Sequence, residues 1–177
     1  MNFLSTTILG VRRGNITALG GDGQVTLGDT IVKHGAKKIK RLHNGEVLAG
    51  FAGSVADALA LFDKFENYLT KDKGDIIRAA TDLTKEWRQD KILRQLDAML
   101  IVMDREHSLM ISGKGDIIEP DDGVISIGSG SAYAYASARS LLRFSDLPAE
   151  RIVEESLKIV SEICIYTNSR ITVEVLK

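Results

Sequence analysis

Two adjacent threonines near the start of the chain could supply a nucleophile. Thr6 and Thr7 follow the residues Met1-Asn2-Phe3-Leu4-Ser5, which look like a leader whose removal would leave threonine as the first residue. A threonine hydroxyl is ordinarily a poor nucleophile, but a terminal threonine carries an α-amine, with an unperturbed pKa of about 8, that can accept the hydroxyl proton. The competing interpretation is that both threonines simply begin a β-strand, which β-branched residues favour.

One carboxylate and one of two lysines could assist such a nucleophile. Asp22 lies in Gly20-Gly21-Asp22-Gly23-Gln24, where glycines allow close approach of another backbone, although a plain turn would also explain the pattern. Lys37 and Lys38 are adjacent in a segment expected to be extended, so at most one can enter a cleft. A lysine beside a buried terminal threonine would favour loss of the hydroxyl proton and keep the α-amine neutral. The alternative is two solvated lysines on an edge strand.

Two glycine-rich segments could present polar groups beyond the end of a sheet. Gly128-Ser129-Gly130-Ser131 joins a predicted strand to a predicted helix but lacks the features of a Walker loop or a dinucleotide fingerprint. It can instead offer the Ser129 hydroxyl and backbone N–H groups to a site. In Ala49-Gly50-Phe51-Ala52-Gly53, the N–H of Gly50 could point at a developing oxyanion.

Histidine and cysteine do not account for catalysis. We expect His34 and His43 in the basic region, and His107 in a hairpin turn, to be surface residues rather than metal ligands or bases. Cys164 falls on the inward stripe of the last predicted helix, where a buried small apolar residue is the usual role. If the chain is a hydrolase, its base must be another kind of group.

The composition is that of an ordinary globular protein. The 177 residues are 44% hydrophobic and 27% charged, with a formal net charge of -1, so no broad basic field favours nucleic acid or an anionic membrane. The basic run from Lys33 to Arg41 is expected to be a solvated edge strand. The single cysteine favours a reducing compartment, and no apolar run reaches the length of a membrane span, so we expect a cytoplasmic protein.

Hydrophobic periodicity predicts an α+β fold. Two antiparallel sheets stacked face to face, each covered by a helix pair, would give a four-layer αββα sandwich formed by one domain, residues 6–177, after removal of residues 1–5. The predicted strands are 7–11, 16–19, 47–51, 98–103, 108–112, 116–118, 124–127 and 171–175. The predicted helices run from Ser54 to Gly74, from Ile76 past Trp87, from 131 to 144, and from about Pro148 to Cys164.

Seven segments in order resemble one protein family from Thr6 to the C-terminus. The segments are Thr6-Thr7-Ile8 with Val11-Arg12-Arg13, Gly21 to Thr26, Lys37-Lys38-Ile39, Leu48 to Gly53, Ala98 to Val102, Ile127 to Gly130, and Ile163 to Asn168. Together they are similar to the HslV (ClpQ) family of bacterial proteasome-like protease subunits. This family belongs to the N-terminal nucleophile hydrolases, whose αββα sandwich agrees with the predicted order of elements.

The resemblance implies a threonine peptidase that acts on unfolded polypeptides. Thr6 would be the nucleophile and its α-amine the base, with Lys38 supplying positive charge and Asp22 orienting Lys38 and the amine. Ser129 would form a hydrogen bond near the amine, and the N–H of Gly50 would hold the oxyanion. Family members stack two hexameric rings of identical subunits and receive substrate from the hexameric ATPase HslU, so this subunit would bind no nucleotide.

The resemblance also implies a cation held by backbone oxygens after the last long helix. The corresponding residues are Ser161, Cys164 and Thr167, and sodium is the expected ion. Position 161 is serine where relatives commonly have glycine, and serine tolerates unusual backbone angles less well.

Two further alternatives remain open. Ser5 is a rival nucleophile, because some relatives with extended starts are thought to use an N-terminal serine; Thr6 keeps the family spacing to Asp22 and Lys38. The chain could also be a non-catalytic ring-forming subunit that retains its leader, or a small-molecule amidase on the same fold.

Overall fold

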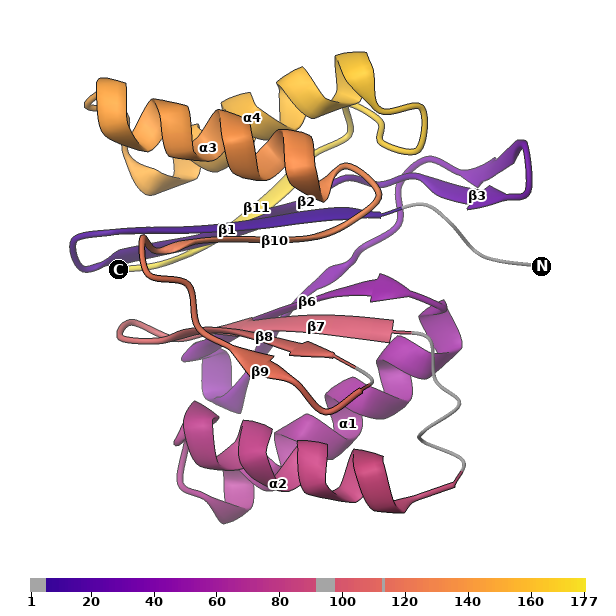
Figure 1. Ribbon diagram of the computed structural model, residues 1–177, viewed down its shortest axis with the longest axis vertical. Helices are drawn as coiled ribbons and strands as arrows, with labels where there is room; N and C mark the ends of the chain where they lie inside the picture. Colours follow the sequence, from indigo (N-terminus) through magenta and orange to yellow (C-terminus); the bar gives the residue numbers. More distant parts are fainter. Residues whose placement is uncertain (1–5, 92–97, 113) are drawn as a thin grey trace.

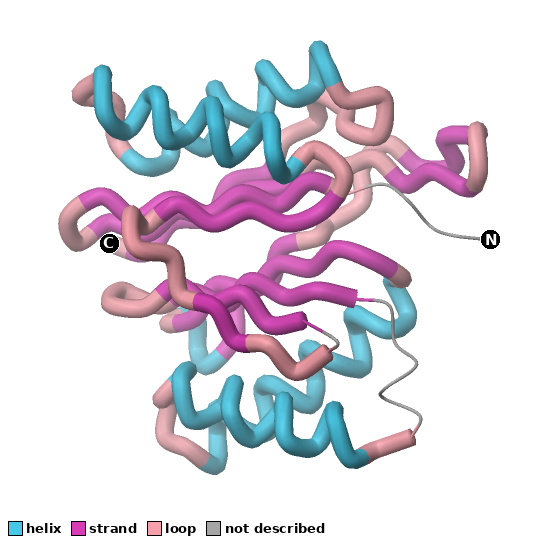
Figure 2. The backbone as a smooth tube through the Cα atoms, viewed as in Figure 1, coloured by secondary structure: helices cyan, strands magenta, loops and turns pink. Residues whose placement is uncertain are grey.

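The chain folds into four layers, as Figure 1 shows for the computed structural model, which describes residues 6–91, 98–112 and 114–177. Two antiparallel sheets are stacked face to face, and each outer face is covered by two helices (Figure 2). The four-layer α+β sandwich predicted from the sequence is therefore confirmed.

The first sheet has the strand order β10-β1-β2-β11 and is covered by helices α3 and α4. Its elements are β1 (Thr7–Arg13), β2 (Ile16–Gly21), β10 (Val124–Gly128), β11 (Thr172–Leu176), α3 (Ser131–Phe144) and α4 (Ala149–Ile163). The second sheet has the order β5-β6-β7-β8-β9 and is covered by α1 and α2. Its elements are β5 (Ile39–Leu42), β6 (Val47–Gly53), β7 (Ala98–Met103), β8 (Ser108–Ser112), β9 (Ile117–Ile118), α1 (Val55–Lys71) and α2 (Ile76–Gln89).

Strand β1 is buried on both faces. Ile8 packs in the apolar cluster between the two sheets, whereas Leu9 and Val11 pack in the cluster beneath α3 and α4. Because neighbouring residues of a strand point to opposite faces, this alternation explains why the strand is apolar from Ile8 to Val11. The start of β1 is thus held between two cores.

The apolar stripe predicted for α2 is confirmed. Ile76, Ala80, Leu83 and Trp87 are all buried, and they pack with α1 and the outer face of the second sheet. No helix in the described ranges is both long and apolar enough to cross a membrane.

The structure corrects three local expectations. The basic run from Lys33 to Arg41 is not one edge strand: residues 34–38 are irregular, and only β5, at residues 39–42, is an edge strand of the second sheet. A separate hairpin of β3 (Val25–Leu27) and β4 (Thr30–Lys33) projects from the body (Figure 1). Pro148 is the N-cap of α4 rather than its first helical residue.

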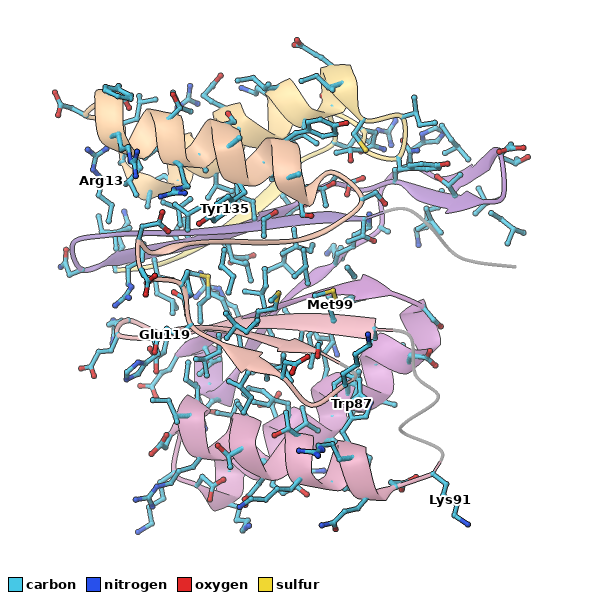
Figure 3. All side chains as sticks on the ribbon, viewed as in Figure 1. Arg13, Trp87, Lys91, Met99, Glu119 and Tyr135 are labelled. Atoms are coloured by element: carbon cyan, nitrogen blue, oxygen red, sulfur yellow. The ribbon has the colours of Figure 1, made fainter. Side chains whose placement is uncertain are left out.

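Arg13, at the end of β1, binds the C-terminal end of α3 (Figure 3). Its guanidinium donates to the carbonyl oxygens of Leu147 at 2.6 Å, Ser145 at 2.7 Å and Leu142 at 3.4 Å. The last carbonyls of a helix lack partners within the helix and carry partial negative charge, so a fixed cation there stabilises the helix end. This contact ties the first sheet to its covering helix.

We expect Arg13→Met to lower the free energy of unfolding by about 1.5–3 kcal/mol, the usual worth of hydrogen bonds to a charged group. Arg143→Met, at an exposed position in the last turn of the same helix, is the matched control and should change stability by less than about 0.5 kcal/mol. Urea unfolding of both variants measures the difference; equal losses would contradict the assigned role of Arg13.

Candidate functional site

The carboxylate of Asp22 is the centre of the candidate site. Asp22 directly follows β2, and its side chain is fully buried. Its Oδ1 accepts from the backbone N–H of Thr7 and from Nζ of Lys38, both at 2.9 Å. Its Oδ2 accepts from the backbone N–H groups of Gln24 at 2.8 Å and Asn168 at 3.4 Å. Four donors therefore surround one buried negative charge.

Lys38 is the buried member of the lysine pair, as the sequence predicted. Its side chain is 3% exposed and pairs with Asp22, while Lys37 is exposed. Burial lowers the pKa of Lys38 below its ordinary value, and the adjacent Asp22 carboxylate opposes that shift. Lys38 lies directly before β5, so this edge strand fixes the position of the Lys38 backbone.

Thr6 directly precedes β1 and is 4% exposed. Its carbonyl oxygen accepts from the backbone N–H of Ser129 at 2.8 Å. Gly128 has φ +96°, and a Cβ at this position would lie 1.9 Å from the Thr6 carbonyl oxygen. The turn between β10 and α3 thus needs glycine at 128 and brings the backbone N–H of Ser129 to the Thr6 carbonyl. A hydrogen bond from Ser129 near the amine of Thr6 stays a prediction.

Gly50 lies in β6, opposite Ile39 of β5 and Ile101 of β7. A Cβ at Gly50 would lie 2.8 Å from Cγ2 of Ile8 and 3.1 Å from Cδ1 of Ile39. The residue therefore has a packing role, because it lets the start of β1 approach the second sheet closely. Its use as an oxyanion donor stays a prediction.

Sequence reasoning missed a second set of polar contacts around Thr7. This side chain is fully buried, and its Oγ1 lies 2.7 Å from Oγ1 of Thr167 and accepts from the N–H of Gly130 at 3.1 Å. Asn168, the next residue along, also donates to Asp22. The available signal was a hydroxyl residue directly before the apolar run of residues 8–11.

The three residues proposed for a cation lie where α4 ends. Ser161 is in the last turn of α4, Cys164 directly follows the helix, and the N–H of Thr167 donates to the carbonyl of Cys164 at 3.0 Å. Ser161 lies within the helix and has no positive φ, so the expected difficulty with an unusual backbone angle does not arise. Cys164 is buried in the cluster beneath α3 and α4, which confirms its predicted packing. Carbonyls at a helix C-terminus carry partial negative charge, so this donor set fits a hard cation.

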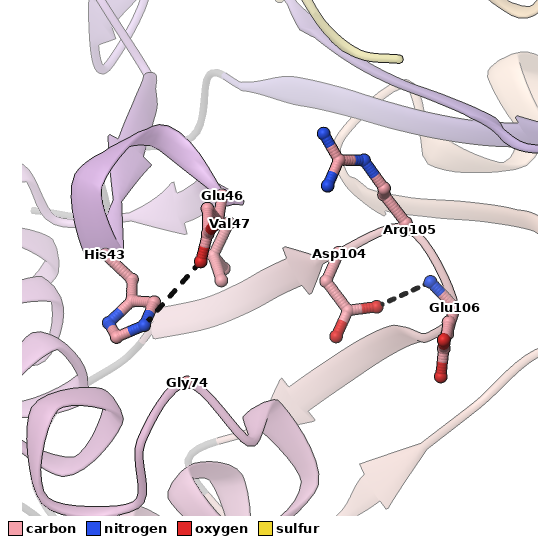
Figure 4. Close-up of a pocket in the computed structure, with 7 residues that line it drawn as sticks. All are labelled: His43, Glu46, Val47, Gly74, Asp104, Arg105 and Glu106. Carbon is pink, nitrogen blue, oxygen red and sulfur yellow. Dashed lines mark hydrogen bonds and ion pairs between the residues drawn. The ribbon is translucent and has the colours of Figure 1, made fainter.

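The side-chain contacts of His43 and His107 lie away from Asp22: His43 is near Glu46 and His107 is near Glu119. His34 is exposed, as expected, while His43 and His107 are half-buried. His43 lines a cavity of about 230 Å³, shown in Figure 4, between the start of β6 and the turn from β7 to β8. The residues that line it are His43, Glu46, Val47, Gly74, Asp104, Arg105 and Glu106. Within the described residues, no three His, Cys, Asp or Glu side chains are grouped to hold a metal ion.

Comparison with known proteins agrees with this geometry. The family model described as "Proteasome subunit" matches residues 3–176. The chain is 56% identical to "ATP-dependent protease subunit HslV" of Pseudothermotoga lettingae, covering 98% of this chain and 99% of the relative. It is 57% identical to the protein of the same description from Desulfovibrio desulfuricans, covering 97% and 98%.

A solved structure gives the same result for the fold. The crystal structure of eukaryotic HslV from Trypanosoma brucei superposes with a TM-score of 0.92 at 43% identity, covering 97% of this chain and 99% of the other. The chain belongs to the HslV family of proteasome-like protease subunits. Thr6, Asp22, Lys38, Gly50 and Ser129 all lie within the region that matches the family.

A double-mutant cycle tests the buried pair. We expect Asp22→Asn and Lys38→Met each to destabilise the protein by about 3–5 kcal/mol, because each leaves an uncompensated buried charge. The double variant should lose less than the sum of the two, since neither charge then remains. Urea unfolding of the wild type and the three variants, compared in the same oligomeric state, measures the coupling. Additive losses would show that the two charges do not depend on each other.

Proposed function

We propose that this chain is the proteolytic subunit of an ATP-dependent protease and that it hydrolyses peptide bonds with Thr6 as an N-terminal nucleophile. The observation that carries the proposal is the position of Thr6: the next residue along donates its N–H to the Asp22 oxygen that also binds Lys38. Thr6 therefore directly precedes a residue that is bonded to the buried ion pair of Asp22 and Lys38, which supports its assignment as the nucleophile.

Removal of the five leading residues would create the reactive terminus. Residues 1–5, Ser5 included, lie outside the described residues. Cleavage between Ser5 and Thr6 would free the α-amine of Thr6 and leave its hydroxyl as the attacking group. The alternation along β1 supports Thr6 over Ser5: Thr7 contacts Thr167 and Ile8 lies against Gly50, so continuing the extended chain by one residue would place the Thr6 side chain on the side of Ile8. A shift of one residue would place the nucleophile on the other side.

In the first half of the reaction, Oγ of Thr6 attacks the carbonyl carbon of the scissile peptide bond, and its proton passes to the α-amine of Thr6. The ammonium of Lys38 lowers the pKa of both the hydroxyl and the amine, while Asp22 holds Lys38 in place. The N–H of Gly50 donates to the oxyanion, and Ser129 forms a hydrogen bond near the amine. The carbon–nitrogen bond then breaks, and the leaving amine takes the proton from the α-ammonium.

In the second half, water releases the acyl group. The α-amine of Thr6 takes a proton from a water molecule while the oxygen of that water attacks the ester carbonyl. When the ester bond breaks, the oxygen of Thr6 takes this proton from the α-ammonium and becomes a hydroxyl again. The enzyme returns to its starting protonation state. One residue therefore serves as nucleophile and base in both halves.

The family resemblance implies the assembly that we propose. The description of the relatives as ATP-dependent protease subunits supports an ATPase partner, and the resemblance implies that this partner is the hexameric HslU, which delivers unfolded polypeptides. We propose two stacked hexameric rings of this chain, working in the cytoplasm, with no nucleotide bound to this subunit. We further propose that carbonyl oxygens of Ser161, Cys164 and Thr167 hold a sodium ion, which would stabilise the end of α4 and supply no chemical step.

Substitution of the nucleophile tests the proposal. We expect Thr6→Ala to lower peptide hydrolysis by at least roughly 1000-fold, as removal of a nucleophile does in other hydrolases, and Ser5→Ala to leave the activity of the mature protein unchanged. Peptidase assays with and without the ATPase, combined with intact mass, measure both activity and leader removal. Activity lost only in the serine variant would assign the nucleophile to Ser5. A retained leader with no hydrolysis would favour a non-catalytic ring subunit, and turnover of a compact amide without the ATPase would favour an amidase.

The pH profile tests the role of Lys38. Hydrolysis requires a neutral α-amine and a charged Lys38. As the pH rises, kcat/KM should therefore increase when the amine loses its proton and decrease when Lys38 loses its proton. Because burial lowers the pKa of Lys38, the alkaline fall should come below the ordinary lysine pKa. Arginine does not titrate in this range, so Lys38→Arg should lose the alkaline fall in whatever activity remains. An unchanged alkaline limb in that variant would exclude Lys38 as the titrating group.

A further inference from the structure

Asn168 makes contacts that no catalytic role yet explains. Its backbone N–H donates to Oδ2 of Asp22 at 3.4 Å. Its side-chain Oδ1 accepts from the N–H groups of Gly23 and Arg170, each at 3.1 Å, and its Nδ2 donates to the carbonyl of His34 at 3.0 Å. The amide thus uses an acceptor and a donor at once, which few side chains can do.

Two of the three partners of this amide, Gly23 and His34, lie in the loops that carry the ion pair. Gly23 directly follows Asp22, and His34 begins the irregular segment that ends at Lys38. These loops are already in backbone contact, because the N–H of Ala36 donates to the carbonyl of Gly23 at 2.9 Å. A Cβ at Gly23 would lie 2.4 Å from the carbonyl oxygen of His34. Asn168 therefore spans a tight junction between the Asp22 loop and the Lys38 loop.

A neighbouring side chain reinforces the same connection. Nε2 of Gln24 donates to the carbonyl of Ile165 at 2.9 Å, which gives a second link between the Asp22 loop and the segment that follows α4. Thr167 in turn contacts the hydroxyl of Thr7. The segment from 165 to 168 is thus bonded to the Asp22 loop and to the start of β1.

We propose that Asn168 is a positioning residue that holds the Asp22 and Lys38 loops together, so that the Lys38 ammonium stays in place beside Thr6. The inference rests on the proposed function, because it assigns a support to that same site. Asn168 touches neither the nucleophile nor substrate in this account; it acts through Gly23 and His34.

The expected effect is on kcat more than on KM. Displacement of a catalytic group by about 1 Å can cost roughly 100-fold in rate, so we expect Asn168→Ala to lower kcat about 10- to 100-fold and to change KM less than about 2-fold. Looser loops would weaken the influence of Asp22 on Lys38, and this influence raises the lysine pKa. The alkaline limb of the pH profile should therefore move to lower pH, which a general loss of stability would not produce.

The experiment compares three variants of the full chain in its assembled state. Asn168→Asp keeps the acceptor toward Gly23 but sets a carboxylate oxygen, which cannot donate, against the His34 carbonyl, so its kcat should also fall below that of the wild type. Ser169→Ala, at an exposed position in the same loop, is the matched control and should behave like the wild type. Thermal unfolding and gel filtration identify any variant that fails to fold or assemble. If Asn168→Ala fails, the kinetics of Asn168→Asp test the positioning role instead.

The outcomes separate this inference from the proposed function. The positioning role is wrong if Asn168→Ala has the same kcat and the same alkaline limb as Ser169→Ala while Thr6→Ala is inactive. Asn168→Asp takes the place of Asn168→Ala in this comparison if the alanine variant does not assemble. In either case the proposed peptidase activity would still stand. If the wild type is no more active than Thr6→Ala, the proposed function itself fails.

Discussion

The structure around the site depends on one buried carboxylate. Burial of an ion in a protein interior costs several kcal/mol unless opposite charge and hydrogen bonds replace the lost water. Asp22 obtains both, from the ammonium of Lys38 and three backbone N–H groups. Three of these donors, from Thr7, Lys38 and Asn168, come from segments that are far from Asp22 in the chain. The full set of partners that makes the buried charge tolerable is therefore present only in the folded chain.

This dependence explains which parts of the site the sequence could predict. Asp22, Lys38 and Ser129 stand in short patterns whose residue types suggest chemistry, and alternation alone shows that only one lysine of the pair can be buried. The family resemblance supplied their order and roles. The support from Asn168 could not be predicted in this way, because its bonds to Gly23 and His34 join residues more than a hundred positions apart. Such contacts depend on tertiary structure, which periodicity does not reveal.

The same distinction holds for the fold. Helix α2 was predictable because its apolar stripe and its polar face differ clearly, and α3 was predictable because glycine and a β-strand precede it. The β3–β4 hairpin was missed because β4 is exposed along its whole length and so shows no alternation between buried and solvated residues. The prediction of one strand from Lys33 to Arg41 was wrong because the charge pattern does not show that residues 34–38 are irregular. It also does not show that Lys38 within this run is buried.

The contacts that position the start of β1 are made by residues that follow the bond between Ser5 and Thr6, which leader removal would cut. The N–H of Thr7 binds Asp22, its hydroxyl contacts Thr167 and Gly130, and the Thr6 carbonyl accepts from Ser129. None of these groups belongs to residues 1–5, and cleavage before Thr6 changes only the nitrogen of that residue. These contacts are present in a chain that still carries residues 1–5, so the proposed cleavage would not have to create them. In this account, leader removal adds a base beside a strand whose start is already held by its own contacts.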